Sequence, residues 1–352
     1  MNDLQLALIG AGAVAVAVVL GFNKWQERKQ KKLAEKVFKG GQADALMEDQ
    51  DAADDAVARQ EPMLPEDAAT ESAEPPPLPA QYADEITDCI VRIEFTEPVA
   101  AACLLEATSR WAAQVGKPMF WLGLDDEAGA WYLLSPHDGS SYKTICASLQ
   151  LVDRQGAVLD AELSVFLNGV WELASQYAGI TSIPKHDDVL AVAQALDSFC
   201  AEVDLQLGVK IACAGGSMAG SRLKQSAEAA GLSLRDDGAF HDIDAHGLTR
   251  FTLTHIGTEP FEAASLDALL IHGVMLTMDV PRVPDGTAAF DALVTAAKSL
   301  TRAIDGALVD SQGNPLTADM IATIRARIDQ IQALMVEHQI VAGSTRALRL
   351  FS

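Results

Sequence analysis

The sequence predicts an α+β protein that begins with a single transmembrane helix and continues through a disordered linker into antiparallel sheets packed on helices. Three observations predict this class. An uncharged apolar run opens the chain, an acidic and proline-rich segment follows, and strand-like runs then alternate with amphipathic helices in an order that recurs. The recurrence predicts that the α+β unit is duplicated.

The apolar run at residues 4–22 is predicted to form a transmembrane helix within an anchor at residues 1–23. At 1.5 Å per residue such a helix spans roughly 28 Å, close to the hydrocarbon thickness of a bilayer. Seven lysines and arginines follow in the basic segment 24–39. The positive-inside rule therefore predicts a single pass, with the N-terminus outside and the bulk of the chain in the cytoplasm.

Two alternatives for the apolar run are less consistent with its flanks. A signal peptide carries its positive charge before the apolar run, and a buried core helix has no one-sided basic flank. Three small residues, Gly10, Ala13 and Ala17, share one face of the predicted helix, which permits self-association.

The formal net charge of −23 argues against a nucleic-acid-binding protein, because such proteins carry a basic footprint. The cysteines are odd in number and lack C-x-x-C spacing, so we expect reduced thiols packed in a cytoplasmic core. They are Cys89, Cys103, Cys146, Cys200 and Cys213.

Residues 40–84 are predicted to be a disordered linker. Its stretch 44–74 carries eleven carboxylates and the single base Arg59, and prolines at positions 75–77 and 79 close the segment. Too few apolar residues are present to offset the backbone entropy of folding. As a flexible coil the linker would span about 40 Å, and charge repulsion should lengthen it.

A first α+β domain is predicted at residues 85–204. Its strands are expected at 89–95, 119–124, 131–134, 148–152 and 169–173. Its helices are expected after Pro98, as a short stretch at 160–167, and at 187–203 after Pro184. Four tryptophans fall here, and core packing explains most of them, although one or two are candidates to line a peptide groove. They are Trp111, Trp121, Trp131 and Trp171.

A second α+β domain is predicted at residues 205–340, followed by a tail at 341–352. Its strands are expected at 205–214, 232–234, 238–243, 250–255 and 274–280. Its helices are expected at 221–230, at 287–304 after Pro284, and at 318–338 with Thr317 as N-cap. The last helix carries an apolar stripe made of Ile321, Ile324, Ile328, Ile331 and Leu334.

The duplication is predicted from matched segments. Residues 167–170 correspond to 271–274, Gly116 corresponds to Gly231, and the helix after Pro184 corresponds to the helix after Pro284. This pairing predicts that the first copy lacks the final helix. Two unrelated α+β domains with similar element order remain the alternative.

Neither of two polar motifs predicts catalysis strongly. The loop 215–222 is rich in glycine, but it lacks the lysine of a phosphate-binding P-loop and suits a strand-to-helix connection. His241, Asp242, Asp244 and His246 would suit a metal, although a polar hairpin is the more ordinary source of such residues. We therefore expect no cofactor, no metal and no enzymatic activity.

The second copy resembles the C-terminal domain of the ZipA family of bacterial division proteins. The resemblance covers about residues 205–336, and the order of anchor, basic segment, linker and domain is also similar to ZipA. The residues that carry it are 209–213 (VKIAC), 230–232 (AGL), 251–256 (FTLTHI), 273–281 (GVMLTMDVP), 290–304, 306–310 and 316–317.

The resemblance implies that the chain tethers the division protein FtsZ to the inner membrane. It implies a domain that holds the FtsZ C-terminal tail on the open face of an antiparallel sheet, with no catalysis. That tail carries apolar anchors with basic residues, which suits an acidic receptor. By strand position the implied peptide-binding residues are Val209, Ile211, Phe240, Ile256, Met275 and Thr277.

The match to the ZipA pattern departs at two places. Asp237 or its neighbours stand where a methionine is expected, and Thr277 stands where a large aromatic residue is expected. The peptide-binding groove is then either shallower than in ZipA or shifted towards the first copy. The first copy itself is either a second peptide site or a packing partner. Two other functions remain open, a membrane scaffold for another division or envelope protein and a membrane-bound enzyme.

Overall fold

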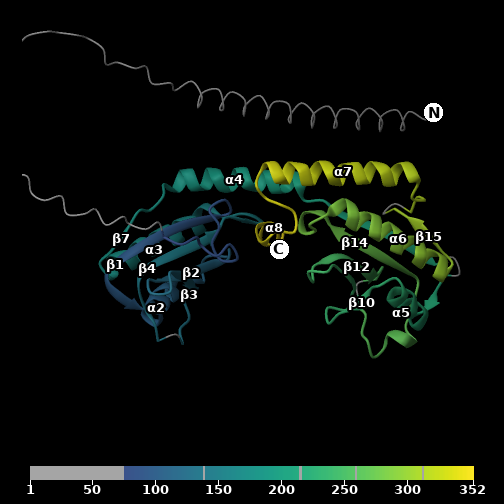
Figure 1. Cartoon of the computed structure of the whole chain (residues 1–352), viewed down its shortest axis with the longest axis horizontal. Helices are drawn as coiled ribbons and strands as arrows, with labels where there is room; N and C mark the ends of the chain where they lie inside the picture. The colour runs from purple at the N-terminus through teal and green to yellow at the C-terminus, as the bar shows by residue number, and fades with distance from the viewer. Residues whose placement is uncertain (1–74, 138, 214–215, 258–259, 311–312) are drawn as a thin grey trace, which may run out of the picture. The chain divides into compact units, whose positions relative to one another are not determined.

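The computed structural model describes residues 75–137, 139–213, 216–257, 260–310 and 313–352 (Figure 1). The predicted anchor, the basic segment and nearly all of the linker lie outside these residues. Among the described residues no helix has the length and apolarity that crossing a membrane requires. Two main antiparallel sheets with packed helices make up the described chain, which confirms the α+β class.

The first half builds a five-stranded sheet in the order β3-β2-β4-β1-β7. Its elements are β1 (Asp88–Ala100), α2 (Ala101–Ala112), β2 (Met119–Asp125), β3 (Ala130–Leu133), β4 (Ser141–Gln150), the small hairpin β5 (Val152–Asp153) and β6 (Gly156–Ala157), α3 (Asp160–Gln176), β7 (Gly179–Thr181) and α4 (His186–Val203).

The second half builds a six-stranded sheet in the order β10-β11-β12-β14-β8-β15. Its elements are β8 (Gln206–Cys213), β9 (Met218–Ala219), α5 (Gly220–Ala229), β10 (Ser233–Leu234), β11 (Phe240–Ile243), β12 (Thr249–His255), the 3-10 turn Leu266–Ala268, β13 (Leu270–Ile271), β14 (Gly273–Asp279), the 3-10 turn Val280–Arg282, α6 (Gly286–Ile304), β15 (Gly306–Val309), α7 (Ala318–Glu337) and α8 (Thr345–Leu350). The Thr317 hydroxyl accepts a hydrogen bond from the Met320 amide, as an N-cap does.

Four strands of each sheet follow one connectivity. The order β7-β1-β4-β2 in the first sheet corresponds to β15-β8-β14-β12 in the second, and both are antiparallel β-α-β-β-α-β arrangements. Each is followed by a long helix, α4 in the first half and α7 in the second. The first half therefore does contain a helix after its last strand, contrary to the prediction, and α3 rather than α4 holds the place in the connectivity that α6 holds in the second half.

The error arises at α3, because residues 169–173 are helical and not a strand. The buried side chains of Leu163, Phe166, Val170 and Leu173 recur at helical spacing along α3. Gly169 interrupts this pattern in the sequence without ending the helix. A Cβ at that position would lie 2.3 Å from Trp111 Cε2, so the glycine lets α2 and α3 approach closely.

We expect Gly169→Val to destabilise the chain by about 1–3 kcal/mol, because the added atoms overlap the Trp111 ring and force it to move. Thermal unfolding of the full chain measures the effect, with the substitution Asn168→Ala at the exposed neighbouring position as the control. Equal melting temperatures for the two variants would contradict the close approach of α2 and α3.

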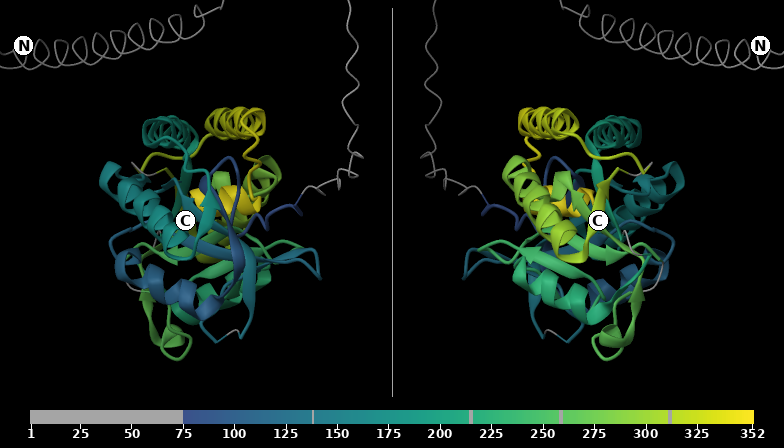
Figure 2. Two further views of the ribbon diagram at one scale, coloured as in Figure 1. Left: turned by 90° about the vertical axis from the view of Figure 1, so that its left-hand side faces the viewer. Right: turned by 90° about the vertical axis from the view of Figure 1, so that its right-hand side faces the viewer.

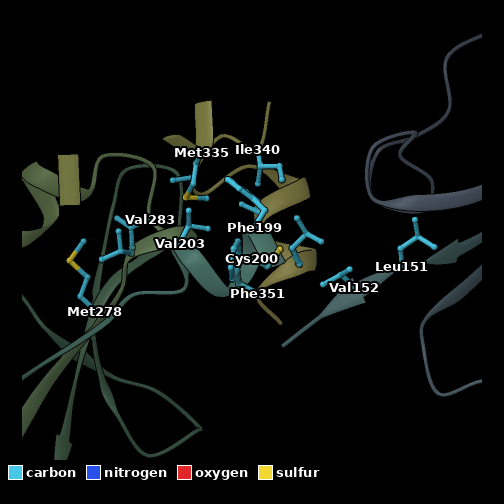
Figure 3. Close-up of a cluster of buried hydrophobic side chains, with 14 of the residues drawn as sticks. Leu151, Val152, Phe199, Cys200, Val203, Met278, Val283, Met335, Ile340 and Phe351 are labelled. Atoms are coloured by element: carbon cyan, nitrogen blue, oxygen red, sulfur yellow. The ribbon is translucent and has the colours of Figure 1, made fainter. Parts of the chain in front are cut away.

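The two halves are joined by a continuous apolar cluster (Figure 3). Helices α4 and α7 lie side by side (Figure 2). The Phe199 ring stacks on His338 with centroids 4.1 Å apart. Arg154 of the first half pairs with Asp204 at 2.8 Å and with Asp279 of the second half at 2.7 Å. Side chains labelled in the cluster are Leu151, Val152, Phe199, Cys200, Val203, Met278, Val283, Met335, Ile340 and Phe351.

The last residues of the chain also belong to this junction. Residues 341–352, predicted as a tail, contain α8, and Leu350 and Phe351 are each 1% exposed. Two arginines of α8 reach back to the start of the first half. Arg346 pairs with Asp84 at 2.7 Å and Arg349 pairs with Asp88 at 2.7 Å.

Candidate peptide-binding face

The central strands of the second sheet alternate between a covered and an open side. On β8, Val209 and Ile211 are buried, and on β14 Val274, Leu276 and Met278 are buried. Helix α6 packs against β8, β12 and β14 on this side. Side chains at the intervening positions therefore point to the opposite side of the sheet.

Strand pairing arranges these opposite positions in rows. Met275 pairs with Lys210 on one side and with Thr254 on the other. We define the outer face of the second sheet as the three rows Gly208–Thr277–Thr252, Lys210–Met275–Thr254 and Ala212–Gly273–Ile256. The strands β12 and β14, which carry this face together with β8, are labelled in Figure 1.

Two glycines keep this outer face shallow. A Cβ at Gly208 would lie 3.5 Å from the Met275 sulfur, and a Cβ at Gly273 would lie 2.4 Å from Ile256 Cδ1. Met275 and Ile256 therefore lie across the glycines of neighbouring strands. Ile256 is 46% exposed and Met275 is half-buried, so an apolar surface remains open at the centre of the sheet. A methionine there can adjust its shape to a ligand.

The six residues implied by the family resemblance do not form one surface. Ile256, Met275 and Thr277 lie on the outer face. Val209, Ile211 and Phe240 are at most 4% exposed and lie on the helix-covered side. These three are corrected to core residues, because a peptide on the outer face cannot reach side chains that point into the opposite layer.

Strand pairing adds residues that sequence reasoning missed, above all Lys210, Thr252 and Thr254. The period of two in β8 groups Lys210 with Gly208 and Ala212, and that signal was present in the sequence. The resemblance implied Val209 and Ile211 for the open side, whereas the structure places them on the side that the helices cover. The alternation in β8 has apolar residues on one side and small or polar residues on the other, and the apolar side is the covered one.

The outer face is less acidic than the composition suggested. Lys210 lies in its central row, and Asp279 at the end of β14 is already paired with Arg154. At the far edge Asp237 pairs with His241 at 2.8 Å. Apolar contact rather than charge is therefore the main attraction that the centre of this face can offer.

The described residues of the two polar motifs make local contacts with one another and with their neighbours. His241 bonds to Thr249 and Asp237, Asp242 pairs with Arg250 at 2.6 Å, and Asp244 accepts the amides of His246 and Leu248. Within the described residues no group of three or more potential ligands gathers for a metal. In the glycine-rich loop, Gly220 begins α5 and packs against the Leu266 carbonyl, as a strand-to-helix connection requires.

One sequence family matches the chain. Residues 206–327 match the family described as ZipA, C-terminal FtsZ-binding domain, which is about a third of the chain. The match begins at the first residue of β8 and ends within α7, so it contains the whole outer face. It supports an FtsZ-binding role in cell division, and the matched family is non-enzymatic. No curated protein matches the chain.

Proposed function

We propose that the second half of this chain binds the C-terminal tail of FtsZ on the outer face of the second sheet. The observation that carries the proposal is the family match at residues 206–327 together with the open apolar centre at Met275 within that range. An antiparallel sheet with helices on one side leaves its other side for a ligand. Met275, Ile256 and Thr277 are the proposed contacts.

The shallow shape of the outer face determines the binding affinity that we expect for the peptide. A short peptide lying over a few half-buried side chains loses conformational freedom on binding and covers a small area. We therefore expect a dissociation constant in the micromolar range, about −8 kcal/mol. Binding of this strength gains from avidity when a polymer presents many tails.

Pull-down of FtsZ by the full chain, with and without the FtsZ tail, tests this proposal. Loss of binding when the tail is deleted is the expected result. Binding that survives tail deletion would place the contact elsewhere on FtsZ. Absence of binding to either form would favour a scaffold for a different division or envelope protein.

We further propose that the chain tethers FtsZ to the inner membrane, with a periplasmic N-terminus and the bulk in the cytoplasm. The apolar run 4–22 and the basic segment after it support this orientation. The acidic stretch 44–74 would hold the folded part away from an anionic membrane surface.

Deletion of residues 1–39 is expected to leave tail binding unchanged while abolishing recruitment of FtsZ to membranes. Both are measured on vesicles, by tail-peptide titration and by co-sedimentation of FtsZ. The full chain reconstituted in the same vesicles is the control. Recruitment of FtsZ by the shortened chain would contradict the tether.

The first half is proposed to be a diverged copy of the same unit. Its connectivity supports this, and so does its register. Gly179 and Gly306 open the strands β7 and β15, and they pair with Phe95 and Cys213 respectively. Arg92 precedes Phe95 by the same number of residues as Lys210 precedes Cys213, so Arg92 and Lys210 occupy equivalent positions. Their partners on the neighbouring strands, Cys146 and Met275, are therefore equivalent as well.

A further inference from the structure

The outer face of the first sheet is covered, whereas that of the second is open. The row Leu122–Cys146–Arg92 corresponds in register to the row Thr254–Met275–Lys210. Leu122 and Cys146 are fully buried although they point away from the helices. Something other than the helices therefore covers this side of the first sheet.

The cover is the chain's own segment 76–83, which we call the cover segment. A separate apolar cluster contains Ala83, Leu122, Trp131 and Cys146, with Leu78, Tyr82, Ile90 and Leu124 packed against it. The Trp131 indole donates a hydrogen bond to the Pro76 carbonyl at 2.8 Å. The Tyr82 and Phe120 rings lie 5.3 Å apart.

The cover segment lies on the sheet as a docked peptide rather than as a strand. It adds no strand to the sheet order, and its amides at Tyr82 and Ala83 bond within the segment, to the Pro79 carbonyl. Proline-rich segments are stiff and extended before they bind, so they dock on aromatic surfaces at low entropic cost. Trp131 and Phe120 supply such a surface here.

Two further side chains on this side of the sheet are fully buried, Cys146 and Ser148, and Ser148 pairs with Ile90 and Phe120. The Ser148 hydroxyl is 0% exposed and, within the described residues, has no hydrogen-bond partner. A buried hydroxyl without a partner costs about 1–3 kcal/mol, which favours release of the cover. Burial also raises the pKa of the Cys146 thiol to about 12, which keeps this side chain neutral and apolar.

We propose that the outer face of the first sheet is a second peptide-binding site that the cover segment occupies as an intramolecular ligand. The external ligand it fits is a peptide that is extended through its prolines and then turns, with a proline, an aliphatic and an aromatic side chain spaced as in Pro76, Leu78 and Tyr82. Because the cover segment is joined to the sheet, its effective concentration is in the millimolar range and masks the site. The proposal does not depend on FtsZ binding to the second sheet.

A labelled peptide with the sequence of residues 75–84 tests the proposal on the full chain. The double variant Leu78→Asp/Tyr82→Asp should release the cover segment and bind the peptide saturably, whereas the unaltered chain should bind it at least about 100-fold more weakly. Adding Trp131→Ala to the double variant should remove the binding. Leu159→Asp is the control, because Leu159 is 65% exposed and lies apart from the cover segment.

A folded double variant that binds no peptide would overturn the proposal, and so would equal binding by the Leu159→Asp control. If the double variant does not fold, the unaltered chain is tested by hydrogen exchange. An excess of the peptide should then speed exchange of the Tyr82 and Ala83 amides, and unchanged exchange would overturn the proposal. FtsZ-tail binding is measured separately, so loss of one site does not imply loss of the other.

Discussion

Met275→Asp is expected to weaken binding of the FtsZ tail by about 100-fold, which takes a micromolar complex beyond detection in an ordinary titration. Met275 lies at the centre of the outer face, between Lys210 and Thr254. A peptide over this position would bury the new carboxylate, and an uncompensated buried charge opposes binding strongly. Titration of the full chain with labelled tail peptide measures the loss.

The control for this variant is Val336→Asp, an apolar-to-acid change on α7 at a position that is 57% exposed. Both variants should retain the melting temperature of the unaltered chain, since neither side chain is in the core. Met275→Leu should keep most of the affinity, because it preserves the apolar volume. Equal affinity of Met275→Asp and the unaltered chain would remove Met275 from the site.

Arg349→Met is expected to destabilise the chain by about 3–5 kcal/mol at neutral pH, because it leaves a buried carboxylate without its partner. The Asp88 side chain is 0% exposed, and its two oxygens accept hydrogen bonds from Arg349 at 2.7 and 2.8 Å. Chemical denaturation measures the free energy of unfolding. Arg325→Met is the control, because its pair with Asp291 is exposed on both sides.

The loss caused by Arg349→Met should depend on pH. Burial raises the pKa of Asp88 above its ordinary value, while Arg349 opposes that rise. Between the ordinary and the raised pKa the folded state binds more protons than the unfolded state, so the free energy of unfolding falls as pH increases. Without Arg349 the pKa rises further and the fall continues to higher pH.

The destabilisation by Arg349→Met is therefore largest at neutral pH and shrinks in acid, where the carboxyl is protonated in both proteins. Adding Asp88→Asn to Arg349→Met should recover part of the lost stability at neutral pH, because the amide carries no charge. A loss that is the same at all pH values and unaffected by Asp88→Asn would contradict the ion-pair explanation.

The sequence predicted the second half more closely than the first. Caps, prolines and alternation delimit most of its strands and helices to within a few residues, although the edge strand β15 was not predicted, and Thr317 is an N-cap as expected. In the first half residues 169–173 were predicted to form a strand, whereas the structure has an uninterrupted helix there. The reason is a tertiary contact with Trp111, which no local pattern can show.

Of the six residues that the family resemblance implies for the site, three lie on the outer face and three lie in the core. Met275 and Thr277 share a face because strand residues alternate, and that rule needs no tertiary information. Assigning β8 to the same face required knowledge of its register with β14, which pairs Met275 with Lys210 rather than with Val209 or Ile211. The cover segment was also missed, because its prolines and small residues are typical of a linker.

Hydrogen exchange of the full chain, with and without a saturating FtsZ tail peptide, tests the central claim most directly. The account predicts slower exchange confined to β8, β12 and β14, around Lys210, Thr254 and Met275. It also predicts unchanged exchange in β2 and β4, which lie beneath the cover segment. Protection centred on any other surface, or no protection at saturation, would contradict peptide binding on the outer face of the second sheet.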